Sequence, residues 1–320
     1  MSQFAFVFPG QGSQSVGMGR ALAESSAAAS AVYAEADDAL GEPISRLAWD
    51  GPGETLDRTE NAQPALLATS IAYLEALRER WSVAGVVAEP AFAAGHSMGQ
   101  YSALVAAGVV PLRDAIRLVR ERGIRMQASG TGRDGAMAAI IGLDDAQLPE
   151  LVAEASTIGT FGVANRNAPG QVVVSGERPA IEAAAEIAKR LGARKAIVLP
   201  VSVAAHSPLM RAAADAMRTV LADVAFADPK PPLLANADAR PLTTGDACRT
   251  ELVEHLTAGV DWVAAVERMT AAGVTAFVEV GPGRVLTGLI KRIAPDAEAI
   301  PLDDAAAPDR LGVPFLATPA

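Results

Sequence analysis

Residues 91–106 read AFAAGHSMGQYSALVA, and this stretch decides how the rest of the chain is interpreted. An apolar run ends at Gly95-His96-Ser97-Met98-Gly99, and a helix-compatible segment follows. A G-x-S-x-G sequence between a strand and a helix is the pattern of a nucleophile elbow, in which the glycines permit a sharp turn that exposes the serine hydroxyl. Backbone N–H groups at the start of the helix could then stabilise an oxyanion. The pattern predicts a nucleophilic Ser97, and a purely structural turn is the alternative.

The composition is ordinary for a soluble enzyme. The chain has 320 residues, half of them hydrophobic and one fifth charged, with a formal net charge of −10. The negative charge argues against nucleic acids and anionic membranes as partners. Cys248 is the single cysteine, which excludes intrachain disulfides and favours a reducing compartment. With no transmembrane run and no signal-peptide pattern, we expect a cytoplasmic protein.

Strands and helices are expected to alternate outside residues 128–202. Apolar runs at residues 4–8 and 276–280, and the run that leads to Ser97, predict strands. Helices are expected at residues 17–40, 63–81, 98–107, 112–128, 208–222, 246–257, 262–272 and 284–293. This alternation is typical of an α/β fold with a mainly parallel sheet flanked by helices. We therefore expect a hydrolase-like core made of residues 1–127 and 203–320.

The pattern changes near residue 130, where a glycine-rich connector begins. Strands are expected at residues 136–141, 160–164, 171–175 and 194–199, and helices at residues 146–156 and 178–191. Their order is β-α-β-β-α-β, the ferredoxin-like arrangement. Residues 128–202 are therefore predicted to form a small subdomain inserted into the core.

Three histidines could act as the base for Ser97. His96 adjoins the serine, and an elbow usually turns such neighbours in different directions. His255 lies in a helix-like stretch. His206 lies between a predicted strand and a predicted helix, where open α/β sheets place catalytic groups. His206 is thus the better placed base, and on placement alone a capping or core histidine is an equal alternative.

Two further patterns carry no chemistry. Gly10 and Gly12 lie in a glycine-rich loop, but neither a G-x-G-x-x-G sequence nor a Walker lysine completes a nucleotide site. The acidic pairs at residues 37–38 and 303–304 have no histidine at ligand spacing, so we expect no metal site.

Six motifs, spread over nearly the whole chain, resemble those of the malonyl-CoA:acyl carrier protein transacylase family. They are similar also to polyketide synthase acyltransferases. The motifs are FPGQGSQ at residues 8–14, GHSMGQYSA at 95–103, Arg122-Gly123 with Met126-Gln127 inside 117–127, NAPGQVVVSG at 167–176, VSVAAHSPLM at 201–210 and EVGPGRVLT at 279–287. Each motif alone is weak, whereas six in the family's order are specific.

The resemblance implies a role for each matching residue. Ser97 would be the nucleophile, and His206 would be its general base and then general acid. The main-chain carbonyl at His255, in place of a carboxylate, would orient His206. The oxyanion hole would consist of the backbone N–H groups of Gln11 and Met98.

The resemblance also implies the substrates. Arg122 would hold the free carboxylate of a malonyl group in a two-pronged hydrogen bond. Without the resemblance, the sequence favours interpreting Arg122 as a surface residue of an arginine-rich helix. Gln11, His96 and Ala205 would line the substrate site. The expected partners are malonyl-CoA, as a substrate, and acyl carrier protein. No cofactor is expected, and the protein is expected to be a monomer.

Three positions depart from the family's pattern. Gln100 replaces a glutamate, and His255 stands where bacterial relatives usually have glutamine and polyketide synthase domains often have asparagine. Ala205 replaces a phenylalanine that often marks malonyl selectivity in polyketide acyltransferases. Because alanine leaves more room, we hypothesise some tolerance of 2-substituted malonyl units.

Other functions remain open at this point. One is a free-standing polyketide synthase acyltransferase that uses malonyl or a 2-substituted malonyl unit. Another is a serine hydrolase or thioesterase, and a third is an inactive carrier-binding module. Docking of an acidic carrier onto this acidic chain would need local positive charge. The candidates are Lys189, Arg190, Arg194 and Lys195 in the insert, and Lys291 and Arg292 near the C-terminus.

Overall fold

The computed structural model describes residues 3–130, 134–199, 201 and 203–311. Its larger part is built on a six-stranded sheet with the order β11-β10-β1-β2-β7-β8. The strands are β1 (Gln3–Phe8), β2 (Phe92–Gly95), β7 (Leu233–Leu234), β8 (Pro241–Leu242), β10 (Val274–Val280) and β11 (Glu298–Leu302). Neighbouring strands pair in parallel, except β7 with β8. The predicted α/β class with a mainly parallel sheet is therefore confirmed.

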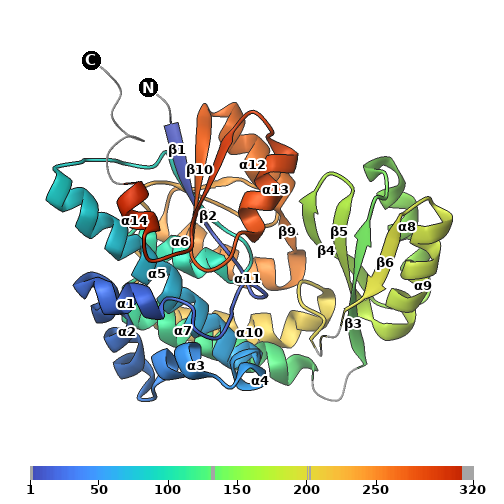
Figure 1. The fold of residues 1–320 in the computed structure, drawn as a ribbon. Helices are drawn as coiled ribbons and strands as arrows, with labels where there is room; N and C mark the ends of the chain where they lie inside the picture. Colours follow the sequence, from blue (N-terminus) through green and yellow to red (C-terminus); the bar gives the residue numbers. More distant parts are fainter. Residues whose placement is uncertain (1–2, 131–133, 200, 202, 312–320) are drawn as a thin grey trace.

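Helices cover both faces of this sheet (Figure 1). They are α1 (Arg20–Ser25), α2 (Ala27–Leu40), α3 (Ile44–Asp50), α4 (Gly53–Leu56), α5 (Thr59–Ala84), α6 (Gly99–Ala106), α7 (Leu112–Gly130), α10 (Arg211–Ala222), α11 (Gly245–Ala258), α12 (Trp262–Ala271), α13 (Val285–Ile293) and α14 (Ala307–Arg310). In the described ranges, no helix combines the length and the hydropathy that a bilayer crossing requires.

The alternation of side chains along β1 divides the apolar interior in two. Phe4, Phe6 and Phe8 point into the larger cluster, which contains α5, α6 and α7. Ala5 and Val7 point into the other cluster, against α12 and α13. Both faces of β1 are thus buried, as expected for a central parallel strand.

The single helix expected at residues 17–40 is wrong. The chain leaves the helical conformation at Ser26, whose φ of −130° and ψ of 123° are extended. The Ser26 hydroxyl accepts a hydrogen bond from the backbone N–H of Ala29 and so begins α2 as its N-cap. The alanine-rich composition favours helix on both sides and hides this break.

The smaller part is a second sheet, with the order β6-β3-β5-β4-β9. Its own elements are β3 (Gly135–Ile141), α8 (Leu148–Ala155), β4 (Phe161–Ala168), β5 (Gln171–Glu177), α9 (Arg178–Arg190) and β6 (Lys195–Val198). This is the predicted ferredoxin-like β-α-β-β-α-β order. The main part contributes the edge strand β9 (Val260–Asp261), which runs parallel to β4. The division at residues 128 and 202 stays a prediction, and residue 202 lies outside the described residues.

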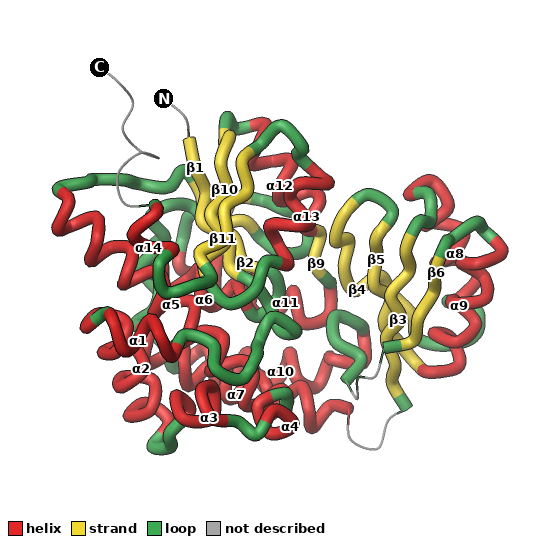
Figure 2. The backbone as a smooth tube through the Cα atoms, viewed as in Figure 1, coloured by secondary structure: helices red, strands yellow, loops and turns green. Residues whose placement is uncertain are grey.

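Alternation in the small sheet decides which side chains face the rest of the molecule. Val172 and Val174 of β5 pack under the helices in the core of the small part. Gln171 and Val173, on the opposite face, line a cavity shared with the main part. The helices α8 and α9 thus lie on the far face of the small sheet (Figure 2).

Candidate active site

Ser97 lies on a sharp turn between β2, which ends at Gly95, and α6, which begins at Gly99. Its φ of 53° is in the left-handed region, where a non-glycine residue is strained. Both flanking glycines are required sterically. A Cβ on Gly95 would lie 2.0 Å from the carbonyl carbon of Gly99, and a Cβ on Gly99 would lie 2.2 Å from the carbonyl oxygen of Phe8. The strand–turn–helix setting predicted for Ser97 is therefore present.

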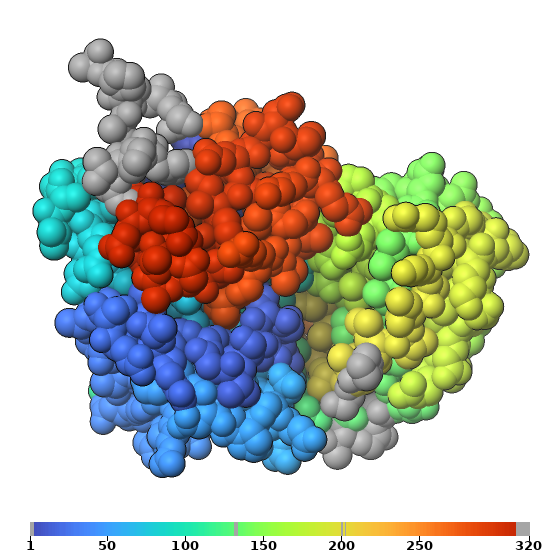
Figure 3. Space-filling view, viewed as in Figure 1, coloured from blue at the N-terminus to red at the C-terminus, as the bar shows by residue number. Residues whose placement is uncertain are grey.

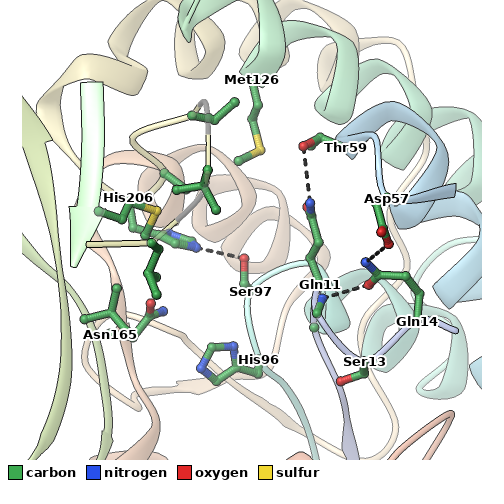
Figure 4. Close-up of a pocket in the computed structure, with 18 of the residues that line it drawn as sticks. Gln11, Ser13, Gln14, Asp57, Thr59, His96, Ser97, Met126, Asn165 and His206 are labelled. Carbon is green, nitrogen blue, oxygen red and sulfur yellow. Dashed lines mark hydrogen bonds between the residues drawn. The ribbon is translucent and has the colours of Figure 1, made fainter. Parts of the chain in front are cut away.

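His206 and Ser97 point toward one another across the cavity (Figure 4). The Oγ of Ser97 lies 2.8 Å from Nε2 of His206, and Nδ1 of His206 lies 2.7 Å from the carbonyl oxygen of His255. A carbonyl can only accept, so Nδ1 carries the proton and Nε2 is free to accept the serine proton. Burial, and then the charge of Arg122, lower the pKa of His206 to about 3, which keeps it neutral. The arrangement is that of a serine activated by a base.

Arg122, on α7, is the cation of this site and is only 1% exposed. Its Nη1 donates to Oε1 of Gln63 at 2.8 Å, and its Nη2 donates to Oγ of Ser97 at 3.2 Å. Within the described part of the chain, no carboxylate forms an ion pair with it, and burial lowers its pKa. A buried cation without an anion is costly, so the site favours a ligand that brings a negative charge.

Two backbone N–H groups near Ser97 are free to bind an oxyanion. Met98 precedes the first residue of α6, and Gln11 lies in the loop that follows β1. Among the described residues, neither backbone N–H has a hydrogen-bond partner. The side chain of Gln11 holds this loop in place, because its Nε2 donates to Oγ1 of Thr59 at 3.3 Å. The loop lies close to the elbow, since a Cβ on Gly10 would lie 2.6 Å from the carbonyl oxygen of His96.

His96 and Ala205 also line the cavity. The Nε2 of His96 lies 2.8 Å from Oδ1 of Asn167 on β4, so the histidine joins the two parts of the molecule. Burial lowers the pKa of His96, which keeps its ring neutral. His96 is therefore directed toward β4 and does not compete with His206 for Ser97.

Gln100 has a structural role in the elbow. Its fully buried side chain accepts a hydrogen bond from the backbone N–H of Gly95 at 3.2 Å and donates one to the carbonyl oxygen of Leu234 at 3.0 Å. An amide can do both, whereas an ionised glutamate could only accept. The departure from the family's glutamate is thus matched by a donor and an acceptor that suit glutamine.

Asn236, which sequence reasoning missed, holds the elbow on the side of β7. Its Oδ1 accepts from the backbone N–H of Ser97 at 2.8 Å, and its Nδ2 donates to the carbonyl oxygen of Gly95 at 3.0 Å. The backbone N–H of Asn236 in turn donates to Oε1 of the buried Glu251 at 2.6 Å. The available signal was a polar residue directly after the short apolar run at Leu233–Leu234, which is strand β7. Gln63, the partner of Arg122, was missed as well.

The cavity that contains Ser97 has a volume of about 930 Å³ and lies between the two parts. Figure 3 shows the hollow on the surface between them. The main part contributes Gln11, Ser97, Arg122 and Leu289 among others, and the small part contributes Met137, Asn165 and Val173. The lining combines apolar walls with a few polar groups near the serine, as is usual for a small-molecule site. The described residues contain no cluster of three His, Cys, Asp or Glu side chains suited to a metal ion.

The basic side chains considered for carrier docking lie in different places. Lys189 and Arg190 end α9, on the face of the small sheet turned away from the cavity, and they pair with Glu186 and Glu154. Arg292, at the end of α13, donates instead to the carbonyl oxygen of Pro169 at 2.9 Å and to the side chain of Gln171, which lines the cavity.

The model of one known family, described as the acyl transferase domain, matches residues 5–304. The malonyl CoA-acyl carrier protein transacylase of Escherichia coli strain K12 is 47% identical over 307 residues, which is 96% of this chain and 98% of the relative.

Solved structures agree with this match. An acyl carrier protein S-malonyltransferase from Vibrio cholerae has a TM-score of 0.92 at 44% identity, over 97% of this chain and all of the other. A malonyl-transacylase in complex with a type II PKS acyl-carrier protein has a TM-score of 0.91 at 42% identity, over 98% of this chain and 99% of the other.

Proposed function

The chain belongs to the acyl transferase family, among its malonyl CoA-acyl carrier protein transacylases, and we propose that Ser97 carries the malonyl group from the thiol of coenzyme A to the thiol of the carrier protein. Its function is the transfer of malonyl from coenzyme A to acyl carrier protein. One observation supports the role of Ser97 above all. Its Oγ lies within hydrogen-bond distance of both a neutral imidazole, His206, and a buried guanidinium, Arg122.

In the first half-reaction, Ser97 Oγ attacks the thioester carbon while Nε2 of His206 takes the hydroxyl proton. The backbone N–H groups of Met98 and Gln11 stabilise the oxyanion, and one such donor contributes about 3 kcal/mol to lowering the barrier. The carbon–sulfur bond breaks, and His206 returns the proton to the departing coenzyme A thiolate. The products are free coenzyme A and a malonyl ester on Ser97.

In the second half-reaction, the phosphopantetheine thiol of the carrier gives its proton to His206 and attacks the ester. Collapse of the intermediate releases Ser97, which regains the proton, and leaves malonyl on the carrier. The reaction is thus ping-pong, with a single binding place for both thiols.

Arg122 selects the acyl group. A malonyl ester on Ser97 brings its far carboxylate next to the guanidinium, which lies 3.2 Å from Oγ. An acetyl group leaves the buried cation without an anion, which costs free energy. The selection is therefore for thioesters with a free carboxylate.

The remaining properties follow from the same contacts. Lys291 and Arg292, at the end of α13 beside the cavity, are the proposed docking point for the acidic carrier. One chain provides nucleophile, base and cation, so we infer a monomer that needs no cofactor. A coenzyme A donor and a single buried cysteine support a cytoplasmic location.

A free-standing polyketide acyltransferase with wider extender tolerance is a second candidate. The relative solved with a type II PKS carrier protein supports it, as does the small Ala205 in the cavity lining.

Exchange of labelled coenzyme A into malonyl-CoA without any carrier protein tests the ping-pong scheme. A malonyl-serine intermediate predicts exchange at a rate comparable to overall transfer. An enzyme that exchanges only when the carrier is present would act by direct transfer and refute the scheme.

A further inference from the structure

The side chain and the main chain of His255 face different catalytic groups. Its carbonyl oxygen accepts from Nδ1 of His206 at 2.7 Å, whereas its ring nitrogen Nε2 lies 3.4 Å from Nη2 of Arg122. The side chain is fully buried and does not line the cavity. A substitution at residue 255 can therefore remove the contact with Arg122 while the contact with His206 is kept.

The contact fixes the protonation of the ring. A guanidinium only donates, so Nε2 of His255 must accept and the proton must be on Nδ1. Nδ1 faces Oε1 of Glu251, one helical turn earlier on α11, at 3.9 Å. Burial, the charge of Arg122 and the nearby His206 hold the pKa of His255 well below its ordinary value. His255 is therefore a neutral acceptor for Arg122.

A neutral acceptor suits this position better than an acid. A carboxylate beside Arg122 would neutralise the guanidinium and compete with the carboxylate of the substrate. The imidazole accepts one N–H and leaves the full positive charge for the substrate. It also separates Arg122 from the carboxylate of Glu251.

The need for this acceptor rises during the reaction. In the free enzyme, three groups among the described residues accept from Arg122: Gln63, Ser97 and His255. Acylation turns Oγ of Ser97 into an ester oxygen, which is a poorer acceptor, so Gln63 and His255 remain to fix the plane of the guanidinium. The buried Nε of Arg122 has no hydrogen-bond partner among the described residues, so it does not help to fix that plane.

We propose that the His255 side chain is a positioning residue for Arg122, and that it thereby strengthens the preference for acyl donors with a free carboxylate. This rests on the proposed role of Arg122 in binding malonyl. The His255 side chain acts through Arg122 and touches no reacting atom, so the effect of replacing it should depend on whether the donor bears the carboxylate.

The test compares malonyl-CoA with acetyl-CoA as donors for three variants. His255→Phe removes the acceptor but keeps a flat ring of similar size. His255→Gln keeps an acceptor and is the rescue variant. Cys248→Ala is the matched control, because Cys248 is buried on the same helix and is not among the described hydrogen-bond partners of Arg122. Should the phenylalanine variant fail to fold, as judged by circular dichroism, His255→Leu takes its place.

For His255→Phe, we expect kcat/KM for malonyl-CoA to fall about tenfold, mostly through KM, as for the loss of one hydrogen bond to a charged group. The value for acetyl-CoA should stay within about twofold, and the pH profile should not move, because the carbonyl that orients His206 remains. His255→Gln should restore kcat/KM for malonyl-CoA to within about threefold of the wild-type value. Cys248→Ala should leave the ratio of kcat/KM for malonyl-CoA to that for acetyl-CoA unchanged.

Equal losses for both donors in His255→Phe would show a merely structural role and overturn the proposal. The proposal would be overturned as well if His255→Phe kept the full preference for malonyl-CoA, or if His255→Gln did not restore that preference. A wild-type enzyme without malonyl preference would refute the proposed role of Arg122 itself, and that result is separate from any effect of His255.

Discussion

Replacement of Asn236 by alanine tests whether a single amide holds the nucleophile elbow. The variant loses the acceptor for the backbone N–H of Ser97 and the donor for the carbonyl oxygen of Gly95. A buried polar group left without a partner costs about 1–3 kcal/mol. Two such groups lose their partners here, and water that enters the vacated space should offset part of the cost. We therefore expect the free energy of unfolding to fall by about 2–4 kcal/mol.

Activity should fall as well. Ser97 is held at a φ of 53°, a conformation that persists only when its surroundings enforce it. Release of the turn moves Oγ away from Nε2 of His206, so we expect kcat for malonyl transfer to fall at least about tenfold.

The assays are urea denaturation followed by circular dichroism, and steady-state transfer from malonyl-CoA to the phosphopantetheinylated carrier. The control is Asp238→Ala, since Asp238 is exposed in the same loop and pairs only with Arg240 among the described residues. Its unfolding free energy should change by less than about 0.5 kcal/mol. Wild-type stability and wild-type kcat in Asn236→Ala would refute the view that this amide supports the elbow.

Four further predictions concern residues of the site. Arg122→Met should lower kcat/KM for malonyl-CoA by about a hundredfold to a thousandfold, because it removes the partner of the carboxylate, and should leave kcat/KM for acetyl-CoA unchanged. Equal losses of kcat/KM for the two donors would contradict this. Since the pKa of His206 is about 3, kcat/KM at pH 5 should stay above about half its value at pH 7.5. A profile in which kcat/KM falls as the pH drops below about 6.5 would contradict this. The unfolded imidazole takes up a proton below pH 6.5 but the folded one does not, so folding stability, followed by urea denaturation, should fall as the pH drops from 6.5 toward 3. Ala205→Phe should lower kcat/KM for methylmalonyl-CoA relative to malonyl-CoA by about 10–200-fold, and an unchanged ratio would show that residue 205 does not limit the acyl pocket.

Features encoded in local sequence could be predicted. The elbow is marked by its local G-x-S-x-G sequence, and Gly95 is required by contacts within the turn itself, whereas Gly99 is required by the backbone of Phe8 and Pro9 at the end of β1. The six-motif pattern then identified His206 and Arg122, which the structure brings to Ser97 from 109 and 25 residues away.

Features that depend on distant packing could not be predicted. Asn236 reaches Ser97 across 139 residues, and strands β7, β8 and β9 have two residues each, too few for a periodic pattern. The positions of Lys189 and Arg190 relative to the cavity also could not be predicted from their charge. That depends on how α9 packs.

Intact mass after incubation with malonyl-CoA, with the carrier absent, shows whether Ser97 itself becomes acylated. We predict a gain of about 86 Da, the mass of one malonyl group, located on the peptide that contains Ser97 and absent from Ser97→Ala. An adduct that persists in Ser97→Ala, or a wild-type enzyme that transfers malonyl without ever gaining this mass, would show that Ser97 does not carry the malonyl group.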